Sequence, residues 1–189
     1  MEKRNAEFIM GSFCEHMDPV SVLDYRYGTE EMRTIFRANS YLQALLEVEA
    51  TLAEVQEEKN IIPKGTSSKI RNGISAVKRE RVEEIESQIN HDVMAVVKAL
   101  EEQSEDAGKW IHFGATSYDI VDTARALQHK SAIALLEIAI DKLLDALAHL
   151  AEEHKETVML GRTHGQWATP ITFGLKKAVF TSDLKRHRD

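Results

Sequence analysis

Apolar residues recur at helical spacing along most of the chain, and the first such run starts at Thr29. Charged residues separate its apolar members, which are Met32, Ile35, Phe36, Leu42, Leu45, Leu46, Leu52 and Val55. Spacings of three and four residues place side chains on one face of a helix. Thr29 suits the N-cap, Glu30 and Glu31 suit the positive N-terminal end, and Asn60 can close the helix. The pattern predicts one long helix from residue 29 to about residue 60.

A short helix and a second long one are predicted next. After the connector "IIPKGTSS", Ser67 or Ser68 can cap a short helix that runs through about Val77. The second long pattern runs from about Arg79 to Gln103, and its apolar positions are Val82, Ile85, Ile89, Val93, Val96, Val97 and Leu100. Three consecutive polar residues, "NHD" at 90–92, interrupt it, so this pattern places them in the middle of a helix.

The longest predicted helix starts near Ser117 and runs to about Glu153. It is rich in Ala, Leu and Ile, and it exceeds the roughly 8–20 residues typical of globular helices. Its apolar content is too high for a lone surface helix, which predicts burial in a bundle. After the polar loop "GRTHGQWAT", Thr169 and Pro170 are expected to be the N-cap and first residue of a last helix.

The chain shows no alternating strand pattern and no internal repeat, so we expect an all-α fold. Residues 1–28 lack sustained periodicity and are expected to form an extended arm with a short helix. The predicted architecture is a helical N-terminal domain followed by the start of a long-helix bundle.

Composition and charge narrow the functional classes. The 189 residues are 43% hydrophobic and 29% charged, enough for one substantial core. The formal net charge of −7 gives no basic field that would favour nucleic acid. Cys14 is the only cysteine, which excludes an intramolecular disulfide and a cysteine-cluster metal site. The absence of a membrane-length apolar run and of a secretory h-region predicts a cytoplasmic protein.

Four polar clusters lie at helix breaks or on otherwise apolar elements. They are "RYGTEEM" at 26–32, "NHD" at 90–92, "HFGATS" at 112–117 and "GRTHGQ" at 161–166. Each has a structural explanation as a cap or a surface segment. The N–H groups that a cap leaves free at a helix N-terminus can also bind anions. His164, in a loop flanked by glycines, is the strongest single candidate for function, because loops on a rigid scaffold often carry it.

No metal or cofactor is expected. The histidines offer no pair at i and i+4 on one helix face, since His149 and His154 are five residues apart. The sequence has no phosphate-binding glycine loop, nucleophile elbow or Rossmann fingerprint. Hydroxyls, imidazoles and an arginine remain, and they suit binding an anionic substrate and moving protons. These residue types alone do not name the reaction.

In order and spacing, the clusters resemble the adenylosuccinate lyase family of the fumarase/aspartase superfamily. The matching stretches are "YRYGTEEM", "NHDVMAVVKAL", "HFGATSYDIVDTA" and "GRTHGQWATPITFG", and the likeness covers roughly residues 22–189. It implies β-elimination of fumarate from adenylosuccinate to leave AMP, and the same cleavage of the succinyl-carboxamide ribotide earlier in purine synthesis. The implied substrate is a purine nucleotide.

The resemblance implies a catalytic role for His164 as the acid that protonates the departing nitrogen, because an imidazole titrates near neutral pH. On this reading the glycines of the loop leave room for substrate. Thr116 and Ser117 would hydrogen-bond the succinyl moiety at the start of a long helix. His112 would lie close to them, and Gln166 would orient the loop.

The same resemblance places the remaining candidates in the substrate site. Arg26 and Tyr27 match the arginine–tyrosine pair with which the family grips the nucleotide. Asn90, His91 and Asp92 would line the site, with His91 at the phosphate end.

The implied fold is all-α, with three domains per subunit, a tetrameric bundle of central helices, and active sites built from three subunits. Residues 1–111 would form the first domain, and residues 112–189 only the opening of the central bundle. The serine base of the family's signature loop has no counterpart here. We therefore expect an N-terminal fragment that is inactive alone and, with apolar faces left without partners, prone to associate.

Two other readings remain open. One is a sister lyase of the superfamily that acts on a different succinyl or fumaryl adduct. The other is a non-catalytic helical interaction module, in which the polar clusters serve only as caps.

Overall fold

The computed structural model describes residues 26–188, which belong to two compact units, Met1–Ala132 and Ile133–Asp189. The predicted arm as far as residue 25, and Cys14 with it, lie outside the described residues. The predicted domain division between residues 111 and 112 stays a prediction.

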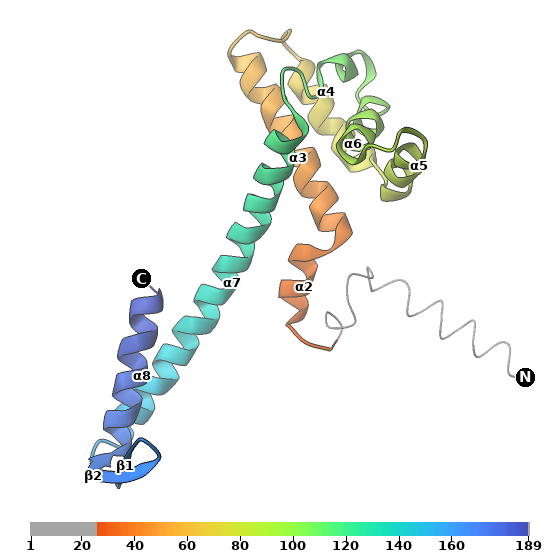
Figure 1. Cartoon of the computed structure of the whole chain (residues 1–189). Helices are drawn as coiled ribbons and strands as arrows, with labels where there is room; N and C mark the ends of the chain where they lie inside the picture. The colour runs from red at the N-terminus through yellow and green to blue at the C-terminus, as the bar shows by residue number, and fades with distance from the viewer. Residues whose placement is uncertain (1–25, 189) are drawn as a thin grey trace, which may run out of the picture. The chain divides into compact units, whose positions relative to one another are not determined.

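The all-α prediction is confirmed, with one small sheet added. The elements in chain order are α2 (Glu30–Phe36), α3 (Ala38–Glu58), α4 (Thr66–Gly73), the 3-10 turn η1 (Ile74–Ala76), α5 (Arg79–Ile89), α6 (Asp92–Glu101), the 3-10 turn η2 (Glu105–Trp110), α7 (Ser117–Glu153), β1 (Val158–Thr163), β2 (Gln166–Thr172) and α8 (Phe173–Arg188). Figure 1 shows α3 to α6 gathered in the first unit, and the hairpin and α8 in the second.

The first predicted helix is in fact two helices. The Thr29 hydroxyl accepts the N–H of Met32 at 3.3 Å, so Thr29 is the predicted N-cap. Arg37 then takes an extended conformation, with ψ of 151°, and separates α2 from α3. Asn60 follows α3 with a left-handed φ of 57°, which confirms it as the closing residue. The break at Arg37 was missed because the apolar spacing continues across it.

The prediction that Ser67 or Ser68 caps the next helix is wrong. α4 begins at Thr66, after Gly65. The Glu57 carboxylate, at the end of α3, accepts the N–H groups of Gly65 at 2.8 Å and Ser67 at 2.7 Å. The N-terminal N–H groups of α4 are therefore capped by a carboxylate up to ten residues earlier in the chain, and not by the hydroxyl of Ser67 or Ser68. The helix also ends at Gly73, earlier than predicted.

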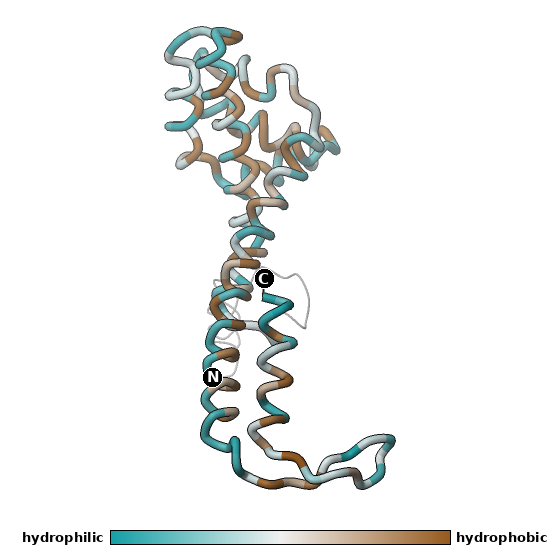
Figure 2. Tube along the Cα trace, turned by 90° about the vertical axis from the view of Figure 1, so that its left-hand side faces the viewer, coloured by the Kyte–Doolittle hydropathy of each residue, from teal (hydrophilic) through white to brown (hydrophobic). Residues whose placement is uncertain are grey.

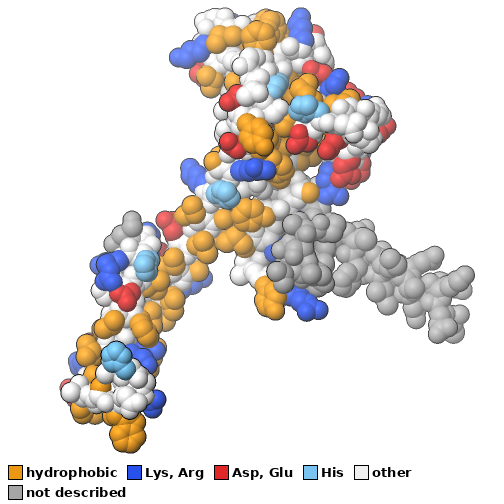
Figure 3. Space-filling view, in the orientation of Figure 1, with side chains coloured by type: hydrophobic (Ala, Val, Ile, Leu, Met, Phe, Trp, Pro, Cys, Tyr) orange, Lys and Arg blue, Asp and Glu red, His pale blue; other side chains and the backbone are white. Residues whose placement is uncertain are grey.

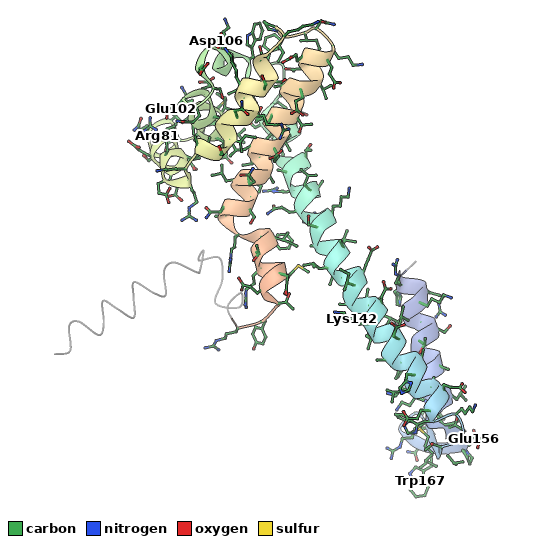
Figure 4. All side chains as sticks on the ribbon, turned by 180° about the vertical axis from the view of Figure 1, so that it is seen from behind. Arg81, Glu102, Asp106, Lys142, Glu156 and Trp167 are labelled. Atoms are coloured by element: carbon green, nitrogen blue, oxygen red, sulfur yellow. The ribbon has the colours of Figure 1, made fainter. Side chains whose placement is uncertain are left out.

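The core of the first unit is built from α3, α4, α5, α6 and the first turns of α7. Its largest fully buried apolar side chains include Leu46, Ile70 and Leu100, and Ile120 with Ala124 bring α7 into the same cluster. Ion pairs brace the outside. Arg81 of α5 donates to both oxygens of Glu102 just beyond α6, at 2.9 and 2.6 Å, and Figure 4 labels this pair.

The second unit consists of the remainder of α7, the hairpin and α8. The predicted bounds of the long helix are confirmed, since α7 runs from Ser117 to Glu153. Figures 1 and 2 both show α8 running beside the last turns of α7. Arg188 pairs with Asp141 at 2.9 Å and ties the two helices together. A Cβ at Gly174 would lie 2.4 Å from the Ala151 carbonyl oxygen, so this contact requires glycine.

Many apolar side chains of the second unit are exposed. Figure 3 shows them along α7, and the large ones are Ile133, Leu136, Ile138, Leu143, Val158, Leu160, Trp167, Leu175, Val179 and Phe180. Only Gly161 and Gly174 are buried among the described residues of this unit. No helix within residues 26–188 is long and apolar enough to cross a membrane.

The expectation of a loop and a helix start at residues 161–170 is wrong. β1 and β2 pair antiparallel here, Thr169 and Pro170 lie within β2, and α8 begins at Phe173. The hairpin is exposed on both sides for most of its length, so it shows no alternation of apolar and polar residues. Without a buried face, the strands leave no period-two signal in the sequence.

Candidate active site

His164 lies at the tip of the hairpin, in a turn of two residues between β1 and β2. Its φ is 49° and that of Gly165 is 71°. Positive φ at both central residues is what a type I′ turn requires, and the twist of such a turn matches that of the strands. The left-handed conformation costs a residue with a side chain about 1–2 kcal/mol. Such an outlier supports a functional hypothesis for His164.

The His164 side chain is exposed and has no hydrogen-bond partner among residues 26–188. Its neighbours are fixed by strand pairing, with Thr163 opposite Gln166 and Arg162 opposite Trp167. Trp167 is 80% exposed and projects from the hairpin in Figure 4. The turn therefore presents an exposed imidazole that makes no hydrogen bond within the part of the chain that the structure describes.

The backbone geometry explains why two positions of this segment are glycines. At Gly161, where the register is irregular, an added Cβ would lie 2.3 Å from the Thr169 carbonyl oxygen. Gly165 occupies the second left-handed position of the turn. Space for a substrate, the reason expected from the sequence, stays a prediction.

The "NHD" segment separates two helices, so the prediction that His91 lies within a helix is wrong. Asn90 closes α5 with a left-handed φ of 52°, and its N–H donates to the Glu86 carbonyl at 2.7 Å. His91 is the N-cap of α6, because its Nδ1 accepts the N–H of Met94 at 3.3 Å. The sequence signal was ambiguous because histidine is not among the usual N-cap residues.

The cap favours one tautomer of the neutral His91 ring. A nitrogen that accepts a hydrogen bond carries no proton, so the neutral ring bears its hydrogen on Nε2. Asp92 Oδ1 lies 3.6 Å from the same Nδ1 and accepts the adjacent N–H of Val93 at 2.8 Å. All three residues of the segment, Asn90, His91 and Asp92, are exposed.

His112 has a partner that sequence reasoning missed. Its Nδ1 lies 2.6 Å from Oε1 of Glu49, and its backbone N–H donates to Oε2 of the same carboxylate at 3.1 Å. Glu49 is 1% exposed and lies in the middle of α3, 63 residues away in sequence. Burial raises the pKa of the Glu49 carboxyl, and the hydrogen bonds from His112 oppose that rise. The one sequence signal for this pair is that Glu49, a charged residue, occupies a position of α3 that is buried.

Thr116 and Ser117 lie where α7 begins, four residues beyond His112. Ser117 is the first residue of α7. The Thr116 N–H donates to the Asp119 carboxylate at 2.9 Å, and the Asp119 N–H donates to the Thr116 carbonyl at 3.0 Å. The residue at the third helical position therefore reaches back to the residue before the helix, as in a capping box.

Arg26 and Tyr27 precede α2 and are both exposed, Tyr27 to 67%. The Tyr27 carbonyl accepts a hydrogen bond from Arg33 Nη1 at 3.4 Å. This contact orients the backbone and leaves the phenol ring in solvent.

Two groups of candidates each share a junction between elements of the first unit. His112, Thr116 and Ser117 share the junction that opens α7, and residues 90–92 share the junction between α5 and α6. Both junctions and the pair before α2 belong to the first unit, whereas His164 belongs to the second.

An open groove of about 640 Å³ lies between α7 and α8 and is lined largely by small residues, including Ala148, Ala151 and Gly174. It contains none of the candidates, and its charged lining residues include Glu152 and Lys155, which pair with each other at 2.6 Å. Among residues 26–188, no group of three His, Cys, Asp or Glu side chains could hold a metal ion.

Comparisons with known proteins find relatives of this chain in sequence and in structure. Residues 24–189 match the family described as Lyase. The chain is 48% identical over 171 residues to the adenylosuccinate lyase of Methanocaldococcus jannaschii, covering 89% of this chain and 37% of that protein. It is 47% identical over 170 residues to that of Pyrococcus abyssi, covering 89% and 38%. The chain thus spans little more than a third of the length of these relatives.

Solved structures show the same fold. A fumarate lyase from Mesorhizobium sp. BNC1 superposes with a TM-score of 0.79 at 36% identity, over 86% of this chain and 40% of that one. The β-carboxy-cis,cis-muconate cycloisomerase of Acinetobacter calcoaceticus sp. ADP1 also gives 0.79, at 28% identity, over 88% and 40%.

Proposed function

Because the chain belongs to the lyase family that it matches over residues 24–189, we propose that it acts as the N-terminal part of an adenylosuccinate lyase. The reaction is elimination of fumarate from adenylosuccinate to leave AMP, together with the matching cleavage of the succinyl-carboxamide ribotide. The complete enzyme is proposed to be a cytoplasmic homotetramer of purine nucleotide biosynthesis. The high identity to curated relatives of this name supports the proposal.

The elimination moves one proton off carbon and one onto nitrogen. A base removes the proton from the carbon next to a carboxylate, and negative charge builds on that carboxylate. The C–N bond then breaks, its electron pair goes to the nitrogen of the purine nucleotide, and fumarate is released. That nitrogen needs a proton from an acid that is effective near neutral pH, which favours a histidine.

His164 is the residue proposed to supply that proton, and its position carries the proposal. It is exposed at a two-residue turn, without a hydrogen-bond partner among residues 26–188. A group in this setting can approach a bound substrate without first breaking a protein contact. The base is proposed to come from outside these 189 residues, since none of the four motifs supplies it.

The remaining candidates are proposed to bind the substrate. Thr116 and Ser117 would hydrogen-bond the succinyl group at the N-terminus of α7, where backbone dipoles favour a carboxylate. Arg26 and Tyr27 would hold the nucleotide, with Asn90, His91 and Asp92 lining the site near its phosphate. No cofactor or metal is required by this chemistry.

A sister lyase is the nearest alternative function. The fold alone does not separate the two, because the fumarate lyase and the cycloisomerase superpose with the same TM-score. The higher identity to adenylosuccinate lyases favours the nucleotide substrate. A non-catalytic helical module would need His164 to be dispensable.

The proposal is tested by fumarate release from adenylosuccinate. We expect the 189-residue chain alone to be inactive and to become active when it is mixed with a separately expressed C-terminal portion of a related adenylosuccinate lyase. His164→Ala should then lower turnover by about 10²–10⁴-fold, the usual contribution of a general acid.

His149→Ala is the matched control, because that histidine is 81% exposed on α7 of the same unit. It should leave turnover unchanged. Equal activity of the His164→Ala and His149→Ala mixtures would refute the assignment of the acid. Turnover by the chain alone would refute the proposal that the base lies outside it.

A further inference from the structure

A buried carboxylate in the middle of α3 has all its polar partners within residues 26–188 on one other residue. Glu49 is 1% exposed, and an unpaired carboxylate at such a position is strongly unfavourable. Its Oε2 accepts the backbone N–H of His112 at 3.1 Å, and its Oε1 lies 2.6 Å from His112 Nδ1. Each of the two carboxylate oxygens of Glu49 therefore contacts a nitrogen of His112.

α3 holds the loop before α7 at a second point. Gln56 lies seven residues after Glu49, and two helical turns place both on the same face. Gln56 Nε2 donates to the Phe113 carbonyl at 2.6 Å. The loop is thereby fixed at adjacent residues, and His112 keeps a left-handed φ of 61°. Gln56 supports only the backbone of the loop, whereas Glu49 also contacts the imidazole.

The contacts decide which ring nitrogen carries the proton. A carboxylate is the only side-chain group of this size that accepts two N–H bonds with two oxygens at once. Burial raises the pKa of the Glu49 carboxyl, whereas the hydrogen bonds from His112, including that of its backbone N–H, oppose the rise and favour the ionised form. With Glu49 ionised, His112 Nδ1 must carry a hydrogen. Its Nε2 then has no hydrogen-bond partner within residues 26–188, and the side chain is 13% exposed.

We propose that Glu49 is a positioning residue, which holds His112 through Nδ1–H and leaves Nε2 to face the substrate beside Thr116 and Ser117. The hydrogen bond that one ring nitrogen of an imidazole makes determines whether the other ring nitrogen carries a hydrogen. In this arrangement Nε2 accepts a hydrogen bond from the substrate when the ring is neutral and donates one when it is charged. The part that concerns substrate rests on the proposed function, whereas the tautomer does not.

The tautomer is measured on the 189-residue chain labelled with ¹⁵N-histidine. At about pH 8.5, where an ordinary histidine is neutral, long-range ¹H–¹⁵N correlations report which ring nitrogen is protonated, and His112→Asn assigns the signal. We expect the Nδ1–H form in the unmodified chain. Finding the Nε2–H form there would overturn the proposal.

Glu49→Gln sharpens the test because the amide keeps the shape and offers only one oxygen. The ring and the backbone N–H then compete for it, and we expect His112 to move toward the Nε2–H form. Gln56→Met is the matched control: it removes the other hydrogen bond from α3 to the loop and should leave the tautomer unchanged. A tautomer that stays the same in both variants would contradict the role of Glu49.

Activity of the complemented enzyme supplies the second readout. Glu49→Gln should lower kcat/KM by about 10–100-fold, as loss of an orienting partner does. Gln56→Met should stay within about twofold, because Gln56 contacts the Phe113 carbonyl and not the imidazole. A changed tautomer with unchanged kcat/KM would overturn the positioning role. If the unmodified mixture releases no fumarate, the proposed function fails, and the ring signals of His112 alone then decide whether Glu49 positions it.

Discussion

The two units differ in where their apolar side chains lie, although helices dominate both. In the first unit, leucines, isoleucines and valines from five helices are buried together, with Leu46 at 1% and Leu100 at 0% exposure. In the second unit, comparable side chains on α7 remain exposed, with Leu136 at 52% and Leu143 at 49%. Figure 2 shows hydrophobic residues along both parts of the chain, so apolar content alone does not distinguish them.

The difference separates two sources of stability. The first unit owes its stability to burial, which contributes about 25 cal/mol for each Å² of apolar surface removed from water. The second relies on backbone hydrogen bonds within its helices and hairpin and on ion pairs such as Arg188 with Asp141, and exposed ion pairs contribute at most about 1 kcal/mol each. We expect the second unit to open more readily.

The largest expected effect comes from truncating leucines in each unit. Leu100→Ala should lower the free energy of unfolding by about 2–5 kcal/mol, because it leaves a cavity in a closed core. Leu143→Ala should change it by less than about 0.5 kcal/mol in the isolated chain, because its side chain is half exposed. Urea unfolding followed by circular dichroism measures both. Equal losses would mean that the exposed face of α7 is covered in solution.

Gly161→Ala tests the hairpin by itself. The new Cβ would meet the Thr169 carbonyl oxygen at 2.3 Å, so the strands must separate. We expect a local cost of about 1–3 kcal/mol, the usual penalty for forcing extra volume into a close contact. Hydrogen exchange should show faster exchange at the paired amides of β1 and β2, with the core of the first unit unchanged. Unaltered exchange in the hairpin would show that the close approach is not maintained in solution.

The exposed apolar residues of α7 should drive self-association. Replacing Leu136 and Leu143 with lysine removes two apolar side chains and adds charge, and we expect association to weaken by at least about tenfold, equivalent to about 1.4 kcal/mol. Sedimentation velocity across a concentration series measures the change. Lys142→Ala on the same helix is the control. A chain that is monomeric at all concentrations before substitution would contradict the expectation.

The smallest expected effect is the acid sensitivity of α4. The N–H groups of Gly65 and Ser67 hold the pKa of the Glu57 carboxyl below its ordinary value of 4.5. The folded state then binds fewer protons than the unfolded state, so Glu57 stabilises the first unit above about pH 4.5 and loses that effect as pH falls through its lowered pKa. The stability difference between the unmodified chain and Glu57→Gln should therefore shrink on acidification. A constant difference from pH 7 to pH 3 would contradict the cap.

The candidate site was predictable only in part. The residue types and their order along the chain led to His164, His112 and the "NHD" segment, since each is polar at a break in an apolar pattern. Sequence reasoning misplaced His91 within a helix, because the apolar spacing of α5 and α6 continues across the segment. It also missed Glu49, because a single charged residue in an amphipathic helix is read as solvent-exposed until its environment is known.

What the sequence by itself determined is local. The start of α7 at Ser117, its end at Glu153 and the cap at Thr29 depend on residues within a few positions of one another, and helix spacing and capping express such contacts directly. The tertiary structure decided the rest. The hairpin around His164 forms through cross-strand hydrogen bonds with no buried face, and the Glu57 cap acts across ten residues. The pairing of Glu49 with His112 spans 63 positions, and only the folding of α3 against the start of α7 could bring a buried carboxylate to that imidazole.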